Sequence, residues 1–347
     1  MRKTFVVLLS LGLILVVAAP ALACGGLVNP NGTVALTKTT TLAAYADGVE
    51  HYVTSFEYAG GGAEFGSITP LPAIPSKVQR GGDWTLQRLV QEVTPPPPVA
   101  FLQESDDAGA ESAKAEVVYE AQIEALDITI LKGGGDEVGR WAADNGFALT
   151  PDAPEVLDFY AERSPIFMAA RFDPSRAEEL GQGIGDGTPI HLTIPTPTPW
   201  VPLRILSLGL GPDAVVEADV FLLTEAAPTM LPRPLVPSEK EGMILEVSER
   251  ASSPLLAELR SDKGMKWIPD DMWLSYLRID TPAAKLGHDL AIDVTGFGQP
   301  SPVAAGLVAP RSLANVPSES IDWLPWIVAV TLGAAVLFAI DRKVDAW

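Results

Sequence analysis

Two apolar segments near the ends of the chain constrain its fold more than any other feature of the sequence. Residues 4–19 (TFVVLLSLGLILVVAA) follow a basic start and lead into an A-x-A site, which is the pattern of a secretory signal peptide. Residues 324–340 (LPWIVAVTLGAAVLFAI) are long enough to cross a bilayer core, which needs about 17–25 residues. We therefore expect the residues between these segments to fold outside the cytoplasm.

The A-x-A site places signal cleavage between Ala23 and Cys24, so that Cys24 becomes the first mature residue. A cysteine at this position also suggests thioether lipidation, but Ala21 stands where the lipid signal would have a leucine. The sequence favours ordinary cleavage beside a cysteine that carries no lipid. An uncut segment would instead form a second membrane helix, which the A-x-A exit disfavours.

The second apolar segment has the flanking residues of a membrane anchor. Indole rings favour the membrane interface, and cationic side chains mark the cytoplasmic side. The transmembrane helix predicted over residues 323–341 has such residues at its two ends, namely Trp323, Trp326, Arg342 and Lys343. We therefore expect a single-pass protein of the cell membrane, with residues 342–347 as a short cytoplasmic tail.

Charge and cysteine content exclude several classes of function. The chain has 44 acidic and 24 basic residues, which gives a formal net charge of −20. Such a charge repels nucleic acid and anionic lipid head groups, so we expect no nucleic-acid partner. The single cysteine excludes an internal disulfide. The exported part must then depend on its apolar core, for which about 300 residues are ample.

Frequent Pro and Gly residues indicate short elements joined by many turns. The predicted fold class is α+β and β-rich, with mostly antiparallel sheet and a few short helices. The clearest signal is Asp47-Gly48 between two β-prone runs, because this pair favours a tight hairpin turn. Predicted strands cover residues 33–44, 49–58, 116–131, 166–172, 190–194, 201–208, 215–223, 243–247, 272–279 and 290–294. Predicted helices cover residues 84–93 with Asp83 as N-cap, 136–145 with Gly146 at its end, 154–163 with Asp152 nearby as a cap, and a short segment opened by Ser253-Pro254.

Composition divides the chain into successive regions. A Pro-rich stretch at residues 228–237 suggests a boundary, and residues after 298 lose periodicity and gather Pro, Gly and Ser, as a stalk would. The predicted regions are 1–23 (signal peptide), 24–227 (β-rich extracytoplasmic domain), 228–297 (smaller α+β continuation or second subdomain), 298–322 (stalk), 323–341 (transmembrane helix) and 342–347 (cytoplasmic tail).

The sequence contains no recognisable catalytic or ligand-binding motif. It has no phosphate loop, helical zinc pair, nucleophile elbow or cysteine pair, and the spacing of His51, His191 and His288 matches no metal motif. Residues 181–187 (GQGIGDG) are not followed by the helix that a dinucleotide loop requires. We therefore predict neither a metal site nor a cofactor, and the sequence assigns no catalytic residue.

Proline at alternate positions makes residues 196–200 (TPTPW) unusual, since proline enforces extended backbone and removes sheet donors. One interpretation is a binding lip with Trp200 as its aromatic residue. The other, which we favour, is a rigid connection between two strands.

Several separated segments together resemble a known bacterial family. They are the run from the export signal into residues 23–26 (ACGG), residues 46–51 (ADGVEH), 64–72 (EFGSITPLP), 141–149 (WAADNGFAL), 167–172 (FMAARF) and 199–208 (PWVPLRILSL). In this order they are similar to the family of domain of unknown function 2330, over about residues 24–225 with a continuation to Thr295. The resemblance implies a secreted or membrane-anchored protein and supplies no reaction or catalytic residue. Relatives often carry further cysteines shortly after the first, and their absence here argues against a disulfide or metal role for Cys24.

These observations favour a non-enzymatic role for the exported part. The leading hypothesis is a membrane-anchored extracytoplasmic protein of unknown molecular activity, which serves as a binding or scaffolding module of the bacterial cell envelope with an envelope protein as partner. One alternative is an envelope hydrolase that uses carboxylates such as Glu57, Glu64 or Asp83, because these lie near segments that resemble the family. A second alternative is an accessory or sensory subunit of a membrane complex.

Overall fold

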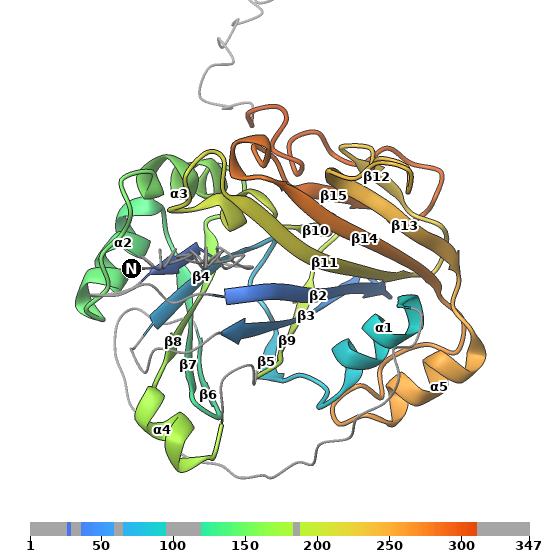
Figure 1. Cartoon of the computed structure of the whole chain (residues 1–347), viewed down its shortest axis with the longest axis horizontal. Helices are drawn as coiled ribbons and strands as arrows, with labels where there is room; N and C mark the ends of the chain where they lie inside the picture. Colours follow the sequence, from blue (N-terminus) through green and yellow to red (C-terminus); the bar gives the residue numbers. More distant parts are fainter. Residues whose placement is uncertain (1–25, 29–35, 59–64, 95–118, 183–187, 311–347) are drawn as a thin grey trace, which may run out of the picture. The chain divides into compact units, whose positions relative to one another are not determined.

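The computed structural model describes residues 26–28, 36–58, 65–94, 119–182 and 188–310. These residues form three β-sheets with five α-helices packed on them (Figure 1). The prediction of a β-rich α+β fold with mostly antiparallel sheet and few helices is confirmed.

Seven strands form the largest sheet. Their spatial order is β13 (Gly242–Arg250), β14 (Trp273–Pro282), β11 (Val215–Thr224), β2 (Leu36–Ala46), β3 (Val49–Tyr58), β9 (Ile190–Pro195) and β5 (Lys77–Arg80). A five-stranded sheet has the order β1 (Gly26–Val28), β4 (Phe65–Leu71), β8 (Ile166–Phe172), β7 (Leu126–Lys132) and β6 (Tyr119–Ile123). A small sheet has the order β10 (Trp200–Val201), β15 (Leu290–Asp293) and β12 (Thr229–Leu231).

The helices are short and lie at the periphery of the sheets (Figure 1). They are α1 (Thr85–Val93), α2 (Gly135–Asp144), α3 (Ala153–Ala161), α4 (Pro174–Glu179) and α5 (Ser253–Ser261), with 3₁₀ turns η1 (Arg204–Ser207) and η2 (Ala283–Lys285). The predicted helices at residues 84–93, 136–145 and 154–163 are confirmed as α1, α2 and α3, and the one opened by Ser253-Pro254 as α5.

The predicted Asp47-Gly48 hairpin is confirmed and lies near the middle of the seven-stranded sheet. Asp47 and Gly48 have φ angles of 53° and 79°, so both occupy the left-handed region that a type I′ turn requires. The turn sets the antiparallel register of β2 and β3, in which Tyr45 lies opposite Glu50. On its other side β2 pairs in parallel with β11, which lies far along the chain.

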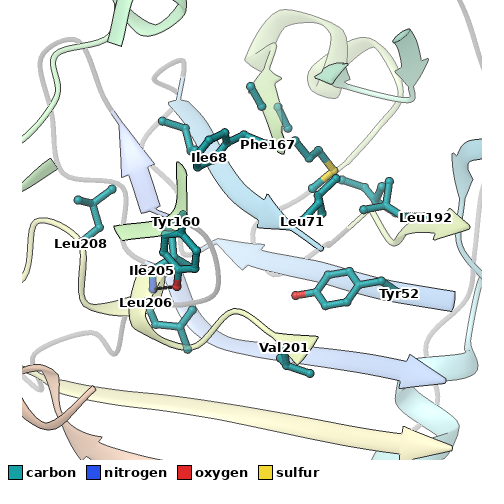
Figure 2. Close-up of a cluster of buried hydrophobic side chains, with 14 of the residues drawn as sticks. Tyr52, Ile68, Leu71, Tyr160, Phe167, Leu192, Val201, Ile205, Leu206 and Leu208 are labelled. Atoms are coloured by element: carbon teal, nitrogen blue, oxygen red, sulfur yellow. Dashed lines mark hydrogen bonds between the residues drawn. The ribbon is translucent and has the colours of Figure 1, made fainter. Parts of the chain in front are cut away.

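The seven-stranded sheet separates two clusters of buried apolar side chains. Successive residues of a strand point to opposite faces, and accordingly Tyr52 belongs to one cluster and Val53 to the other. The first cluster extends through the five-stranded sheet to α2, α3 and η1, and Figure 2 shows its interior around Tyr160 and Phe167. The second cluster is covered by α1 and α5 (Figure 1). The described body therefore has an apolar core on each face of its main sheet.

The cap of α1 comes from an unexpected residue. The prediction that Asp83 caps this helix is wrong, because its carboxylate pairs with Arg80 at 3.0 Å. Asp262, which is 3% exposed and follows α5, takes its place. Its oxygens accept from the backbone N–H groups of Asp83 and Trp84 at 3.0 Å each and from the Thr85 hydroxyl at 2.8 Å. One carboxylate thus ties α5 to the start of α1.

Replacing Asp262 by alanine should destabilise the protein by about 1–3 kcal/mol, because buried donors at the start of α1 lose their acceptor. The measurement is the urea midpoint of the purified full chain. A matched control is Asp270→Ala. Asp270 pairs with Arg260 but is 93% exposed, so its replacement should destabilise the protein by less than about 1 kcal/mol. Equal midpoints for the two variants would contradict the capping role.

Two predicted strands have a different structure. Residues 116–131 were expected as one strand, but they contain the hairpin of β6 and β7, which reverses at Glu124 with a φ of 52°. Glu124-Ala125 carries none of the usual turn residues, so the sequence gives no signal there. Residues 201–208 were expected as a strand, but half of them, Arg204–Ser207, form η1. Buried polar groups described below bend the backbone at this point.

Contacts divide the chain into a unit that ends at Ala309 and a second unit at Pro310–Trp347. The Pro-rich stretch at residues 228–237 lies within the first unit, where β12 pairs with β15. Residues 298–309, predicted as the start of the stalk, also belong to it, and Ala305 is fully buried.

In the described ranges, no helix has both the length and the apolar character that crossing a bilayer requires. The predicted signal peptide and transmembrane helix fall outside those ranges. The same applies to the predicted cleavage, lipidation and membrane-interface residues, which are Ala23, Cys24, Trp323, Trp326, Arg342 and Lys343.

Candidate functional site

Two of the three histidines meet on the seven-stranded sheet. His51 lies on β3 and His191 on the neighbouring strand β9, and His51 Nδ1 is 3.0 Å from His191 Nε2. Gln79, on the edge strand β5, places its Nε2 3.0 Å from the other ring nitrogen of His191. With the Gln79 amide donating to Nδ1, the neutral His191 ring carries its proton on Nε2 and donates it to His51. The result is a hydrogen-bonded chain across three strands.

Trp267 packs over these hydrogen-bonded side chains. Its ring stacks on His51 with centroids 3.6 Å apart and planes inclined by 3°. Trp267 lies between α5 and β14, in the same connection as Asp262, so the segment that caps α1 also closes over the histidines. His191 is 1% exposed as a result.

Burial keeps both imidazoles neutral. It lowers the pKa of His51 to about 4. The pKa of His191 is lowered to about 3, mainly by burial and to a lesser extent by His51 and Lys77. Among the residues with described positions, no three His, Cys, Asp or Glu side chains are placed to hold a metal ion. His288 precedes Asp289 in another part of the fold and does not join the pair. The arrangement fixes the packing of β3, β9 and β5 through hydrogen bonds between their side chains.

Acid should destabilise the protein through this pair. A histidine whose folded pKa lies below its unfolded value of 6.5 contributes stability that is present above pH 6.5 and is lost as pH falls towards 3–4. His191→Gln should therefore lose less stability than the parent protein between pH 6.5 and 4.5, by about 2 kcal/mol. Urea midpoints across this range measure the difference. A ring NMR titration of His191 with a midpoint near pH 6.5 would contradict the assignment.

Glu50 is a second unusual group. It lies on the same face of β3 as Tyr52 and is 0% exposed, and no side chain of the described residues hydrogen-bonds to its carboxyl oxygens. Burial raises its pKa to about 8, which the backbone of Trp200 opposes only in part. Tyr45 lies opposite Glu50 on β2. Burial raises the pKa of the Tyr45 phenol, and Glu50 raises it further. Glu50 therefore enters the core as a neutral acid.

Asp289 is the centre of the best-satisfied polar cluster. It is 0% exposed, and its Oδ1 accepts from the Tyr160 hydroxyl at 2.7 Å and from the backbone N–H groups of Leu203 and Arg204 at 2.8 and 3.0 Å. Its Oδ2 accepts from Arg163 at 2.5 Å. Burial raises the pKa of Asp289, whereas Arg163 and the donors lower it.

The Tyr160 hydroxyl extends this cluster by accepting from the Ile205 backbone N–H at 2.8 Å, the bond drawn in Figure 2. Three consecutive amides of residues 203–205 thus converge on one carboxylate and one phenol. This convergence bends the chain into η1, which explains why the strand predicted at residues 201–208 does not form. The cluster joins α3, η1 and the start of β15, and its role is structural.

Of the three carboxylates proposed for hydrolysis, the structure describes only the side chain of Asp83. Asp83 is committed to Arg80. The side chain of Glu57 and the whole of Glu64 lie outside the described part of the structure.

The interpretation of Trp200 as a binding lip is not supported, because its indole is 4% exposed and stacks on Tyr160 at 5.9 Å. Residues 196–200 instead connect β9 to β10, as the favoured interpretation has it. Gly181 and Gln182 of the glycine-rich segment follow α4, and residues 183–187 fall outside the described ranges.

Sequence reasoning missed Gln79, Trp267, Arg163 and Asp289. None of them belongs to a motif, and each meets its partners only through the tertiary fold. One signal was present, because the alternation of residues 49–58 places His51 on the same face as Val53, Ser55 and Glu57.

The fold and these clusters define a β-rich α+β protein with buried polar networks. Comparison of sequences places it further: the chain belongs to the family described as an uncharacterized protein conserved in bacteria, DUF2330, whose sequence model matches residues 18–225. This confirms the resemblance over that range, while the continuation to Thr295 lies beyond the match. No curated protein matches the chain.

Solved structures with a similar arrangement include the crystal structure of baculovirus P35. It has a TM-score of 0.40 and 10% sequence identity, and the match covers 75% of this chain and 97% of that one. P35 in the crystal structure of the caspase-8/P35 complex matches with a TM-score of 0.35 and 10% identity, covering 74% and 90% of the two chains. At such TM-scores the similarity carries no argument about this protein.

Proposed function

We propose that the chain is a membrane-anchored extracytoplasmic protein that acts as a binding or scaffolding module of the bacterial cell envelope. Support for anchorage comes from the two apolar terminal segments, with the described body between them. Support for binding comes from which side chains the body buries and which it exposes. Its prominent polar clusters, around Asp289 and His191, are buried and bonded internally.

The observation that carries the proposal is this contrast between buried polar groups and exposed apolar ones. Large apolar side chains are exposed at several loops, with Val236 at 60% and Phe297 at 97%. A protein that binds partners uses such surfaces, whereas an enzyme needs reactive groups that a substrate can reach.

In-membrane crosslinking tests this function. The full chain carries a tag on residues 342–347, crosslinking is done in intact cells, and mass spectrometry identifies the proteins that purify with it. The control is an unrelated single-span protein with the same tag. A partner enriched only with this chain supports a binding or scaffolding role. Recovery of the same proteins with both chains would overturn it.

A further inference from the structure

Phe297 is the most exposed large apolar side chain in the described body, at 97%. It lies in the turn that follows β15. A phenylalanine fully in water forgoes the stabilisation that burial would give, of about 1.5–3 kcal/mol. Exposed apolar side chains that gather on one surface mark interaction sites, so the neighbours of Phe297 in the chain matter as well.

The turn is braced, so Phe297 cannot fold back onto the body without breaking several bonds. Asp293 Oδ1 accepts from the Thr295 backbone N–H at 3.1 Å, the Thr295 hydroxyl at 2.6 Å and the Gly298 backbone N–H at 3.1 Å. The Thr229 hydroxyl donates to the Gly298 carbonyl at 3.1 Å, which ties the turn to β12. A Cβ at Gly298 would lie 2.3 Å from the Asp293 carboxylate, so this packing needs glycine.

The segment that contains Phe297 is uncharged. Residues 294–310 include no Asp, Glu, Lys or Arg, although these residues make up 20% of the chain. Leu307 and Val308 in this segment are 48% and 53% exposed. Their backbone N–H groups bond to the Pro302 carbonyl, and the Asp289 backbone N–H bonds to the Ala305 carbonyl. The uncharged segment is thus bonded to the body next to both ends of β15, through Asp289 and Asp293.

The place of this segment in the chain indicates what covers it. The thirteen residues 311–323 separate it from the apolar segment 324–340. Their contour length is at most about 45 Å, since an extended chain spans about 3.3–3.6 Å per residue. If residues 324–340 cross the bilayer, Pro310, at the end of this segment, is held within that distance of the lipid surface.

We propose that residues 294–310 form a lipid-contacting surface, with Phe297 inserted into the interfacial region of the bilayer. This inference rests on the membrane anchorage put forward under the proposed function. The apolar boundary of neutral, zwitterionic lipid is the matching chemistry, because the segment offers no cation for an anionic head group and the chain carries a net charge of −20. The contact holds the body close to the membrane with a fixed face towards it.

Site-specific fluorescence in vesicles tests the contact. The full chain with Cys24→Ser is reconstituted into phosphatidylcholine vesicles, and an environment-sensitive dye is attached through Phe297→Cys or Val308→Cys. The control is Ile74→Cys, which labels a 41%-exposed apolar position on the loop between β4 and β5. Lipids brominated on their acyl chains should quench the dye at 297 at least about twofold more than the dye at 74, with a blue-shifted emission.

The outcomes separate this inference from the proposed function. If the protein resists extraction from the vesicles by alkaline carbonate while the dye at 297 stays as water-exposed as the dye at 74, the lipid contact is wrong and anchorage stands. If carbonate removes the protein, anchorage fails and the lipid contact falls with it. Shielding of the dye in native membranes but not in pure lipid would assign the surface to a protein partner and overturn the lipid proposal.

Discussion

Replacing Asp289 by alanine should destabilise the protein by about 3–5 kcal/mol, because the buried Arg163 then lacks its counter-charge. The side chains of Arg163 and Asp289 are 5% and 0% exposed, so water cannot compensate for the loss. The Tyr160 hydroxyl and two backbone amides also lose their acceptor. The measurement is the urea-unfolding free energy of the purified full chain.

A nearby exposed pair provides the control for this variant. Glu155 is 80% exposed and pairs with the side chain of Arg204, whose backbone N–H donates to Asp289. Glu155→Ala should cost less than about 1 kcal/mol, since exposed pairs contribute little. Asp289→Asn retains an acceptor oxygen but not the charge and should fall between the two. An Asp289→Ala protein as stable as Glu155→Ala would refute the structural role of the cluster.

Glu50 should make the protein lose stability as pH rises. Its pKa of about 8 in the folded state lies above the ordinary value of 4.5, so the folded state binds more protons than the unfolded state between these values. The stabilising contribution is complete below pH 4.5 and is lost as pH approaches 8. Over that range it amounts to about 5 kcal/mol, and Glu50→Gln, which cannot ionise, should lack this slope.

The range from pH 6.5 to 8 isolates this effect, because the histidine pair acts below pH 6.5 and in the opposite direction. The unfolding free energies of the parent protein and Glu50→Gln, from urea titrations, should converge towards acid and diverge by about 2 kcal/mol over this interval. Glu217→Gln removes an exposed carboxylate of β11 and serves as the control. Parallel pH profiles for Glu50→Gln and the parent protein would show that Glu50 is already ionised.

The sequence was informative where structure is local. Asp47-Gly48 fixes a hairpin through its own backbone preferences, and the apolar spacing of residues 84–93 fixes α1. The sequence did not predict local structure that depends on contact with residues far away in the chain. The amides of residues 203–205 bend towards Asp289 and Tyr160, and propensity favours the strand that this contact prevents.

The candidate site shows the same limit. Alternation along residues 49–58 predicts which side chains share a face with His51, but not that His191 and Trp267 meet there. Those contacts depend on β9 pairing with β3 and on the closure of the segment after α5, and both follow from the whole topology.

The parallel pairing of β2 with β11 has a consequence for how the chain acquires its structure. β11 lies between β2 and β14, so the centre of the main sheet joins segments from the beginning, middle and end of the described body. The chain must lose conformational entropy in closing these long loops before the non-local contacts form, which makes folding slow. A fragment that ends with the family match at residue 225 would leave β11 without β14 and Tyr160 without Asp289. The region by which the family is recognised is therefore smaller than the unit that folds.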